Sequence, residues 1–186
     1  DRLENKYMQL TNKINEFLNL INKAKKIVIL TGAGISTESG LPDFRSDDGF
    51  WTKNKPIFFK EFLQDEESRK LSWKRNFELK EKLKSIKPNS GHVFVRDLIN
   101  RSSGHYLITQ NIDGLHSIAG LDDKKIIEIH GNATKASCLN CYKEFNPGIF
   151  HNSVLNDIDI PDCDECGSLV KVSTISFGQP MNEKDH

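Results

Sequence analysis

Three short apolar runs, each followed by glycine or polar residues, constrain the fold of this 186-residue chain more than any other feature. They lie at 27–30, 105–110 and 125–130, with helical patterns between them. Runs of this length that contain β-branched residues are typical of strands, and the first run indicates a strand buried on both faces of a sheet. Strands that alternate with helices favour a parallel sheet with helices on both faces. The expected fold class is therefore α/β.

The segments around these runs carry helical patterns. Apolar residues at spacings of three and four predict an amphipathic helix over 3–24. Residues 46 to about 87 are aromatic and charged, and this region also looks helical, with its aromatic side chains expected to form a local core. A further helix is expected after Asn89, and another over 113–120, where an Asp can cap the start and a Gly can end it.

The charge balance argues against one class of partner. Lys and Arg together number 26, as do Asp and Glu, so the formal net charge is zero. The chain lacks the basic field that non-specific nucleic-acid binding needs, and no direct nucleic-acid partner is expected. No apolar run approaches the roughly 20 residues that span a bilayer, and no secretory leader is visible in a chain that starts at Asp1. We expect a cytoplasmic protein, or a nuclear one if eukaryotic, without a membrane partner.

Four cysteines form two C-x-x-C pairs, Cys138 with Cys141 and Cys163 with Cys166. The two-residue gap lets both thiolates of a pair point at one ion, and two pairs complete a tetrahedral zinc site. Because four protein ligands leave no open position, the predicted role of the metal is structural. Metal spacing, rather than a scattered disulfide pattern, also favours a reducing compartment. A redox pair is the alternative for either C-x-x-C alone, and a zinc ribbon could by itself be a binding module.

The loop after the first predicted strand carries part of a dinucleotide-binding fingerprint. Gly32 and Gly34 match the glycine-rich turn of a Rossmann unit, where backbone N–H groups approach a pyrophosphate and the next helix N-terminus favours negative charge. Thr37 stands where the fingerprint needs a third Gly or an Ala, and no second strand with a terminal acid follows. A dehydrogenase is therefore the weakest of the functions considered.

Polar groups follow all three predicted strands, at 31–36, 110–113 and 130–132. In an open parallel sheet, ligands bind beyond the carboxyl ends of the strands, so we expect these segments to form one site. His130 is the natural general base there, because an imidazole titrates near neutrality.

The other histidines are given structural roles. His116 is the rival to His130, but on the helix after residue 113 a packed or surface role is expected. The neighbours of His92, His105 and His151 suggest solvated surroundings for all three side chains.

Six strings occur in an order that points to a family. They are GAGIS, PDFR, TQNIDGLH, HGN, the paired C-x-x-C and SFGQP, and they extend from about Lys26 to Met181. In this combination the chain resembles the sirtuins, the NAD-dependent protein lysine deacylases. The resemblance implies a zinc ion on the four cysteines, a Rossmann-like domain, and an NAD site formed by Gly32, Ala33, Gly34, Ile35, Asp43, Phe44, Arg45, Gln110, Asn111, Ile112 and Asp113.

The resemblance also implies how the parts of the NAD site act. Ala33, Ile35 and the segment 43–45 would form a mobile loop around the nicotinamide ribose, with its phenylalanine shielding the reaction intermediate. Gln110 and Asn111 would contact that ribose, whereas the next two residues, Ile112 and Asp113, would hold the carboxamide.

The implied reaction consumes NAD. The carbonyl oxygen of an acyl-lysine attacks the ribose as nicotinamide leaves, and the final products are free lysine and O-acyl-ADP-ribose. His130 would be the base and Asn111 the second catalytic residue. Phe177, Gly178 and Gln179 would border an acyl-lysine peptide that lies as an added strand. Mono-ADP-ribosyl transfer shares the first step and stays open, as does a non-catalytic zinc-ribbon fragment.

The chain departs from the family pattern at three places. The family usually has Glu at the position of Gln179. The segment 68–80 lacks the Tyr-x-x-Arg of members that prefer succinyl or malonyl lysine, which favours acetyl or other uncharged acyl groups. The family continues beyond SFGQP with strands that complete the sheet and hold the adenosine half of NAD, so we expect the chain to be a piece of a longer enzyme.

The resemblance suggests a division into three units. An incomplete Rossmann-like NAD-binding domain would comprise 1–46, 88–134 and 172–186. A helical module with a cofactor-binding loop would span 47–87, and a zinc-binding module would span 135–171. The oligomeric state is not indicated by any pattern in the sequence.

Overall fold

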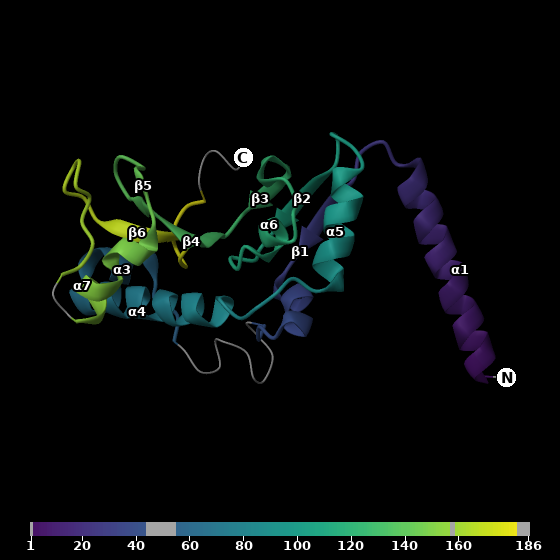
Figure 1. The fold of residues 1–186 in the computed structure, drawn as a ribbon, viewed down its shortest axis with the longest axis horizontal. Coiled ribbons are helices and arrows are strands. Elements are labelled where there is room, and N and C mark those ends of the chain that lie inside the picture. The colour runs from purple at the N-terminus through teal and green to yellow at the C-terminus, as the bar shows by residue number, and fades with distance from the viewer. Residues whose placement is uncertain (1, 44–54, 157–158, 182–186) are drawn as a thin grey trace.

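The computed structural model describes residues 2–43, 55–156 and 159–181, and a parallel sheet of three strands lies near its centre (Figure 1). The strands are β1 (Val28–Thr31), β2 (Tyr106–Thr109) and β3 (Ile126–Glu128), in the order β1-β2-β3. Each strand overlaps its predicted run, and the register places Val28 opposite Tyr106. The predicted α/β class is confirmed.

Helix α5 (Ser90–Asn100) packs on this sheet. Its start is fixed by Asn89, whose side-chain oxygen accepts hydrogen bonds from the N–H groups of Gly91 at 2.8 Å and His92 at 3.4 Å. Its inward side chains belong to a core whose buried members are Val95, Ile99, Leu107 and Leu121. The connections between strands contain the short helix α6 (Leu115–Ile118) and the 3-10 helices η1 (Ala33–Ser39) and η2 (Asp123–Lys125).

Strand β1 is buried on one face only, so the prediction of burial on both faces is wrong in this structure. Val28 and Leu30 are 62% and 63% exposed, whereas Ile29 packs against the core beneath α5. Successive side chains of a strand point to opposite faces, and among the described residues α5 covers the face of Ile29.

Helix α1 (Arg2–Lys23) lies apart from both sheets in Figure 1. The amphipathic pattern forms the predicted helix, but its apolar side chains are exposed, for example Leu10 at 55% and Phe17 at 54%. Within the described ranges no helix is both long enough and apolar enough to cross a membrane.

Helices α3 (Phe59–Gln64) and α4 (Glu66–Leu83) form the helical region predicted between the first two strands. The carboxylate of Asp65 accepts a hydrogen bond from the N–H of Ser68 at 2.8 Å and so caps α4. Phe62, Trp73 and Phe77 are 1%, 1% and 3% exposed, which confirms the local core for these aromatic residues. Phe58 remains 47% exposed and lies outside that core.

A second sheet is antiparallel, in the order β5-β4-β6. Its strands are β4 (Gly131–Cys138), β5 (Glu144–Phe145) and β6 (Val170–Thr174), and η3 (Pro147–Phe150) and α7 (His151–Leu155) lie between β5 and β6 in the chain. Trp73 and Phe77 of α4 share a core with Val170 and Val172 of this sheet. Strand β6 pairs with β4. The predicted boundaries between the Rossmann-like domain and the zinc-binding module, after residue 134 and before residue 172, stay a prediction.

Candidate functional site

The ends of the three parallel strands meet at one edge of the sheet. The N–H of Gln110 donates to the carbonyl of Thr31 at 2.9 Å, and the N–H of Ile129 donates to the carbonyl of Thr109 at 3.1 Å. These bonds continue the hydrogen bonding of the parallel sheet one residue beyond the ends of β2 and β3. The three polar segments singled out in the sequence are therefore neighbours in space.

A buried polar network lies behind this edge. The Ser36 hydroxyl donates to Oδ2 of Asp113 at 2.7 Å and accepts a hydrogen bond from Nδ2 of Asn111 at 3.1 Å. Nε2 of His92 lies 3.4 Å from the same hydroxyl. Ser36, His92, Asn111 and Asp113 are 1%, 0%, 4% and 8% exposed, so these groups satisfy one another instead of water.

The direction of each bond in this network can be assigned. The Asn89 N–H donates to Nδ1 of His92 at 3.3 Å, so the proton of the neutral ring is on Nε2 and faces Ser36. Ser36 then accepts two hydrogen bonds and has one proton, which goes to Asp113. The other carboxylate oxygen of Asp113 accepts from the N–H of Leu115, the first residue of α6, at 2.9 Å, but the N-cap residue of this helix is Gly114 and not the predicted Asp113. The Asp113 side chain is held at both oxygens.

His116 lies beneath the network. Its Nε2 is 3.0 Å from the hydroxyl of Thr31, which itself donates to the Thr109 hydroxyl at 2.8 Å, so Nε2 is the donor. Burial lowers the pKa of His116 to about 4, with a further contribution from the neighbouring His92 ring. His116 is thus packed, as predicted.

The prediction of solvated surroundings is wrong for two histidines. His92 is fully buried and His105 is 5% exposed. Residues distant in the sequence cover both side chains. His92 is covered by η1 and α6, and Nδ1 of His105 accepts the N–H of Ile27 at 3.2 Å from the segment before β1. Burial also lowers the pKa of His92.

His130 differs from these residues because its side chain is exposed. Its Nδ1 lies 3.1 Å from the carbonyl oxygen of Gln110, which can only accept, so Nδ1 carries the proton. In the neutral ring Nε2 therefore has a free lone pair, which is the form a general base needs.

Gly131 determines where the His130 backbone can lie. A Cβ on Gly131 would be 1.9 Å from the carbonyl oxygen of Ser173, and its φ of +74° is in the left-handed region. Only glycine fits this approach of β4 to β6. One residue past the end of β6, the N–H of Ile175 donates to the His130 carbonyl at 2.8 Å.

The predicted substrate segment follows directly from β6. The Phe59 N–H donates to the carbonyl of Phe177 at 2.9 Å, and the rings of Phe58 and Phe177 are 6.0 Å apart. Gln179 closes the turn, since its Oε1 accepts the N–H of Ser176 at 3.1 Å. Phe177 is 51% exposed, so an aromatic surface borders the edge that carries His130.

The strand-end site has features that fit a bound polar ligand. In the described part of the chain, Oδ1 of Asn111 and Nδ1 of His116 are buried without a hydrogen-bond partner. Among the described residues, no atom lies within 4 Å of a Cβ placed on Gly34, and the nearest to one on Gly32 is Oε1 of Gln110 at 3.8 Å. The glycine turn is therefore open on the side where a pyrophosphate would approach.

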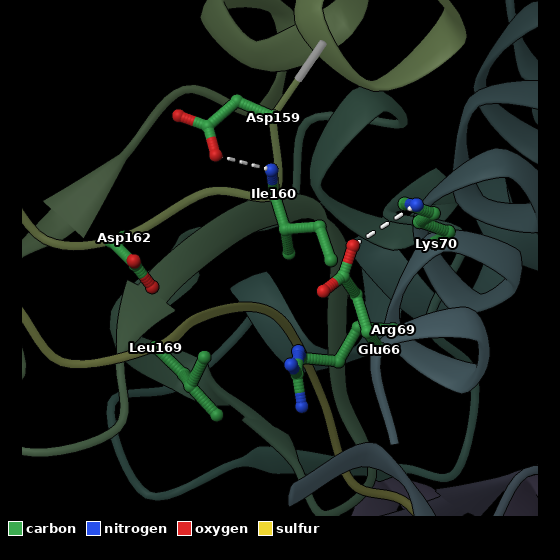
Figure 2. A pocket seen from close by; sticks show the side chains of 7 residues that line it. All are labelled: Glu66, Arg69, Lys70, Asp159, Ile160, Asp162 and Leu169. Carbon is green, nitrogen blue, oxygen red and sulfur yellow. Dashed lines mark hydrogen bonds and ion pairs between the residues drawn. The ribbon is translucent and has the colours of Figure 1, made fainter. Parts of the chain in front are cut away.

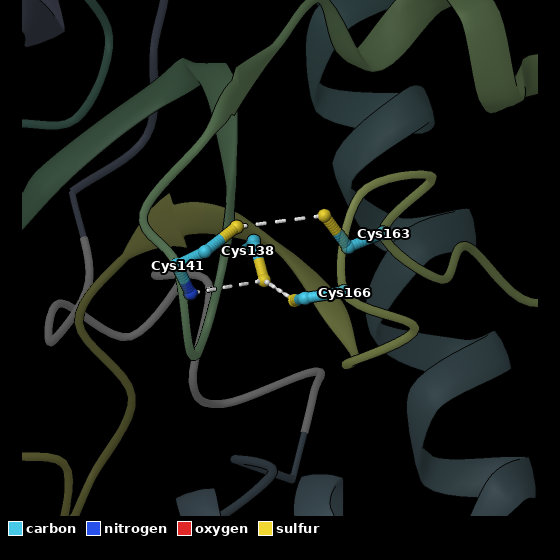
Figure 3. A group of neighbouring side chains, drawn as sticks. All are labelled: Cys138, Cys141, Cys163 and Cys166. Carbon is cyan, nitrogen blue, oxygen red and sulfur yellow. Dashed lines mark hydrogen bonds between the residues drawn. The ribbon is translucent and has the colours of Figure 1, made fainter.

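The four cysteines of the two predicted knuckles come together (Figure 3). Their sulfur atoms all lie within 4.8 Å of one another, with Cys138 and Cys166 at 3.4 Å and Cys141 and Cys163 at 3.6 Å. Zn–S bonds of about 2.3 Å in a tetrahedron place sulfurs about 3.8 Å apart, so the cluster fits zinc. The N–H groups of Asn140 and Cys141 also donate to the Cys138 sulfur, both at 3.4 Å.

A separate surface pocket of about 190 Å³ lies between α4 and the segment that leads into β6 (Figure 2). Within it Lys70 pairs with Glu66 at 3.0 Å, and Asp159 accepts the N–H of Ile160 at 2.8 Å. None of its lining residues belongs to the strand-end site.

Comparison with known proteins places the chain in a family. A model described as Sir2 family matches residues 32–186. The chain belongs to the Sir2 family. A relative from Bradyrhizobium diazoefficiens, NAD-dependent protein deacetylase 1, is 40% identical over 95% of this chain and 69% of its own length. NAD-dependent protein deacylase 2 from Archaeoglobus fulgidus is 34% identical over 94% of this chain and 68% of its own.

Solved structures agree with this assignment. A Sir2 structure with a p53 peptide and NAD+ has 35% identity and a TM-score of 0.74, covering 91% of this chain and 67% of that one. A Sir2Tm structure with a propionylated peptide has 33% identity and a TM-score of 0.73, covering 93% and 68%. The chain thus spans about two thirds of the length of these Sir2 relatives.

The structure brings some of the predicted site residues together, and others lie outside the described residues. Gln110, Asn111, Asp113 and His130 lie together, whereas Phe44 and Arg45 are outside the described residues. Ser36, which donates to Asp113, lies in the predicted segment 31–36 but was given no role, and His92, which contacts Ser36, was expected to be solvated. One pattern could have found His92: it stands three residues after the helix-capping Asn89, where a side chain reaches back to the cap.

Proposed function

We propose that this Sir2-family chain carries the catalytic site of an NAD-dependent protein deacylase that removes acetyl or other uncharged acyl groups from lysine. The observation that carries the proposal is the pairing of an exposed His130, with its Nδ1 proton held by Gln110, and the buried network around Asp113. NAD would supply a ribose carbon that becomes electrophilic as nicotinamide leaves. The names of the relatives support this class of reaction.

The residues around the dinucleotide would divide the work of binding. The N–H groups of Gly32, Ala33 and Gly34 would face the phosphates, whereas the N–H of Ile35 already donates to the Gly32 carbonyl at 3.1 Å. Residues 43–45 would close over the nicotinamide ribose. Gln110 and Asn111 face that ribose, and the free Oδ1 of Asn111 is an acceptor for one of its hydroxyls. Ile112 and Asp113 hold the carboxamide. Because Ser36 and Leu115 fix both oxygens of Asp113, its position is set before the ligand arrives.

His130 would act as the base through Nε2. This nitrogen removes a proton from a ribose hydroxyl, and the positive charge that develops on the ring is stabilised by the Gln110 carbonyl at Nδ1. The carbonyl also keeps the ring in the tautomer that leaves Nε2 unprotonated. His130 and Asn111 are therefore the proposed catalytic residues.

The acyl-lysine would enter beside Phe177, Gly178 and Gln179. The exposed ring of Phe177 suits the aliphatic stem of a lysine and an uncharged acyl group, and the adjoining backbone suits a peptide added as a strand. The zinc held by the four cysteines would have no open position and would keep the β4–β6 sheet folded. A reducing compartment such as the cytoplasm suits these free thiolates.

The test uses an acetyl-lysine peptide with NAD and follows nicotinamide release together with the mass of each product. We expect O-acetyl-ADP-ribose from the parent protein and at least about 100-fold slower turnover for His130→Ala. His151→Ala is the matched control, since His151 lies on α7 with its ring 4.9 Å from Phe77. It should keep the parent rate.

Two results would replace the proposal. ADP-ribose attached to a protein side chain, without O-acetyl-ADP-ribose, would assign mono-ADP-ribosyl transfer to the same NAD site. A folded, zinc-loaded protein with no NAD-dependent activity would instead favour a non-catalytic binding module.

A further inference from the structure

Lys171 in β6 is the one buried lysine among the described residues, with 2% of its surface exposed. A buried ammonium is costly, because it loses its hydration. Burial accordingly lowers the pKa of Lys171 to about 8. No carboxylate of the described residues forms an ion pair with it, so its position has to be explained by the other groups that it contacts.

Those groups are backbone carbonyls and one ring. The Lys171 ammonium donates to the carbonyl oxygen of Thr174 and to that of Val172 at 3.3 Å. It also lies 5.7 Å from the centre of the Phe62 ring of α3, a cation–π geometry. The side chain therefore curls along its own strand and fixes the last residue of β6.

The residue fixed in this way is joined to the catalytic edge. Thr174 is opposite Gly131 in the β4–β6 ladder, and the N–H of Ile175 donates to the carbonyl of His130 at 2.8 Å. The peptide group between Thr174 and Ile175 is thus held by Lys171 at its oxygen and by His130 at its nitrogen. A shift at this peptide group would move the backbone of His130.

The same peptide group leads to the substrate segment. Phe177 follows two residues after Ile175, and its carbonyl accepts the N–H of Phe59, the first residue of α3. Helix α3 also supplies the ring that covers Lys171. Lys171 is therefore at the junction of α3, β6 and the start of β4.

We infer that Lys171 is a positioning residue, which holds the end of β6 so that His130 and Phe177 keep a productive geometry toward an acyl-lysine. The inference rests on the deacylase function proposed above. It assigns to the zinc-side sheet a direct part in the geometry of the base, beyond holding its own metal.

The melting temperature and the catalytic rate together distinguish a positioning role of Lys171 from a purely structural one. Replacing a buried charge by an apolar side chain of similar size is often neutral or stabilising. Lys171→Met should therefore keep or raise the melting temperature. If the ammonium positions the peptide group, the same variant should lose catalysis, because misplacement of reacting groups by about 1 Å lowers rates up to about 100-fold.

The experiment measures kcat and KM for an acetyl-lysine peptide, the KM for NAD, and the melting temperature. We expect Lys171→Met to lower kcat/KM for the peptide about tenfold or more, with KM for NAD changed less than about twofold. Lys171→Arg, which keeps a charged donor, should recover most of the loss. Lys125→Met is the matched control. The Lys125 ammonium also donates to two carbonyls, those of Ile99 at 3.0 Å and Ser102 at 2.9 Å, but Lys125 lies just before β3, at the end of that strand away from His130.

The outcomes distinguish this inference from the proposed function. An inactive parent protein would overturn the deacylase proposal. An active parent with an unimpaired Lys171→Met variant would overturn the role of Lys171 alone. Equal losses of activity and melting temperature in Lys171→Met and Lys125→Met would do the same. If Lys171→Met does not fold, Lys171→Gln decides, and failure of both to fold would make Lys171 structural.

Discussion

The two sheets of this molecule are stabilised in different ways. The parallel sheet is covered by α5 and an aliphatic core, and its polar residues gather where the strands end. The antiparallel sheet shares a core with Trp73 and Phe77, and two of the buried members of that core are the metal-ligating candidates Cys138 and Cys163. One sheet carries the reactive edge, whereas the other holds a closed metal site beside it.

This difference between the sheets shows which contacts hold His130 in position. His130 is the last residue before β4, so the proposed base lies at the point where the chain leaves one sheet and enters the other. Its side chain is oriented by Gln110 from the parallel sheet, but its carbonyl is held by Ile175 from the end of β6. Destabilising the parallel sheet should therefore displace the proposed base through its contact with Gln110, whereas destabilising the antiparallel sheet should displace it through Ile175.

Removal of zinc should produce the largest difference in stability between the two sheets. Structural zinc sites in small peptides bind with apparent free energies of about 10–16 kcal/mol, which is available for folding. We expect Cys163→Ser to lose bound zinc and to unfold β4 and β6, while amides of β1 and β2 stay protected. Zinc content by elemental analysis and hydrogen exchange read by mass spectrometry measure both effects.

The control for this prediction is Ser137→Ala. Ser137 precedes Cys138 in β4, and its hydroxyl accepts only a hydrogen bond from Ser173 at 3.2 Å. This variant should keep its zinc and its protection. Full zinc occupancy in Cys163→Ser, or equal loss of protection in both sheets, would show that the two regions do not differ as described.

A methyl group at the junction of the sheets should have the next largest effect. Gly131→Ala places a Cβ 1.9 Å from the Ser173 carbonyl oxygen and forces a non-glycine residue into a φ of +74°. We expect a loss of about 3–4 kcal/mol in the free energy of unfolding, since backbone rather than a flexible side chain must move. Chemical denaturation measures the change, and deacylation should fall with it.

Gly178→Ala provides the matched control for strain alone. Gly178 also has a positive φ, of +80°, but no atom of the residues that the structure describes lies within 4 Å of its ideal Cβ. Its substitution should cost about 1–2 kcal/mol. If the two alanine variants were equally stable, the close approach of β4 to β6 would not limit residue 131.

The sequence predicted the strands and their polar ends because both are local patterns. Apolar runs of four to six residues and the glycine after Thr31 are visible without tertiary information. The spacing of the cysteines likewise predicted their cluster. The burial of His92 could not be read from its neighbours, since Ser36, 56 residues away in the chain, provides the partner that makes burial tolerable. The role of Lys171 depends on Phe62 and Thr174 in the same way.

The third prediction concerns acid, which should act on the parallel sheet through its buried imidazoles. The pKa of His116 is about 4 in the folded protein, below the 6.5 of an exposed imidazole, because burial disfavours the charged ring. Between pH 6.5 and 4 the unfolded chain therefore binds more protons than the folded one. The free energy of unfolding should rise with pH in this window, by about 1.4 kcal/mol per pH unit at most for one such group.

His116→Gln should flatten this dependence, because its amide can donate to Thr31 but does not titrate. We expect the stability difference between parent and variant to shrink by about 1.5 kcal/mol as the pH falls from 6.5 to 5. Loss of zinc in acid affects both proteins, so the difference between their denaturation curves isolates His116. The Asp113 carboxylate opposes the shift, and His92 favours it. Parallel stability curves across this window would show that His116 does not carry the acid sensitivity of the parallel sheet.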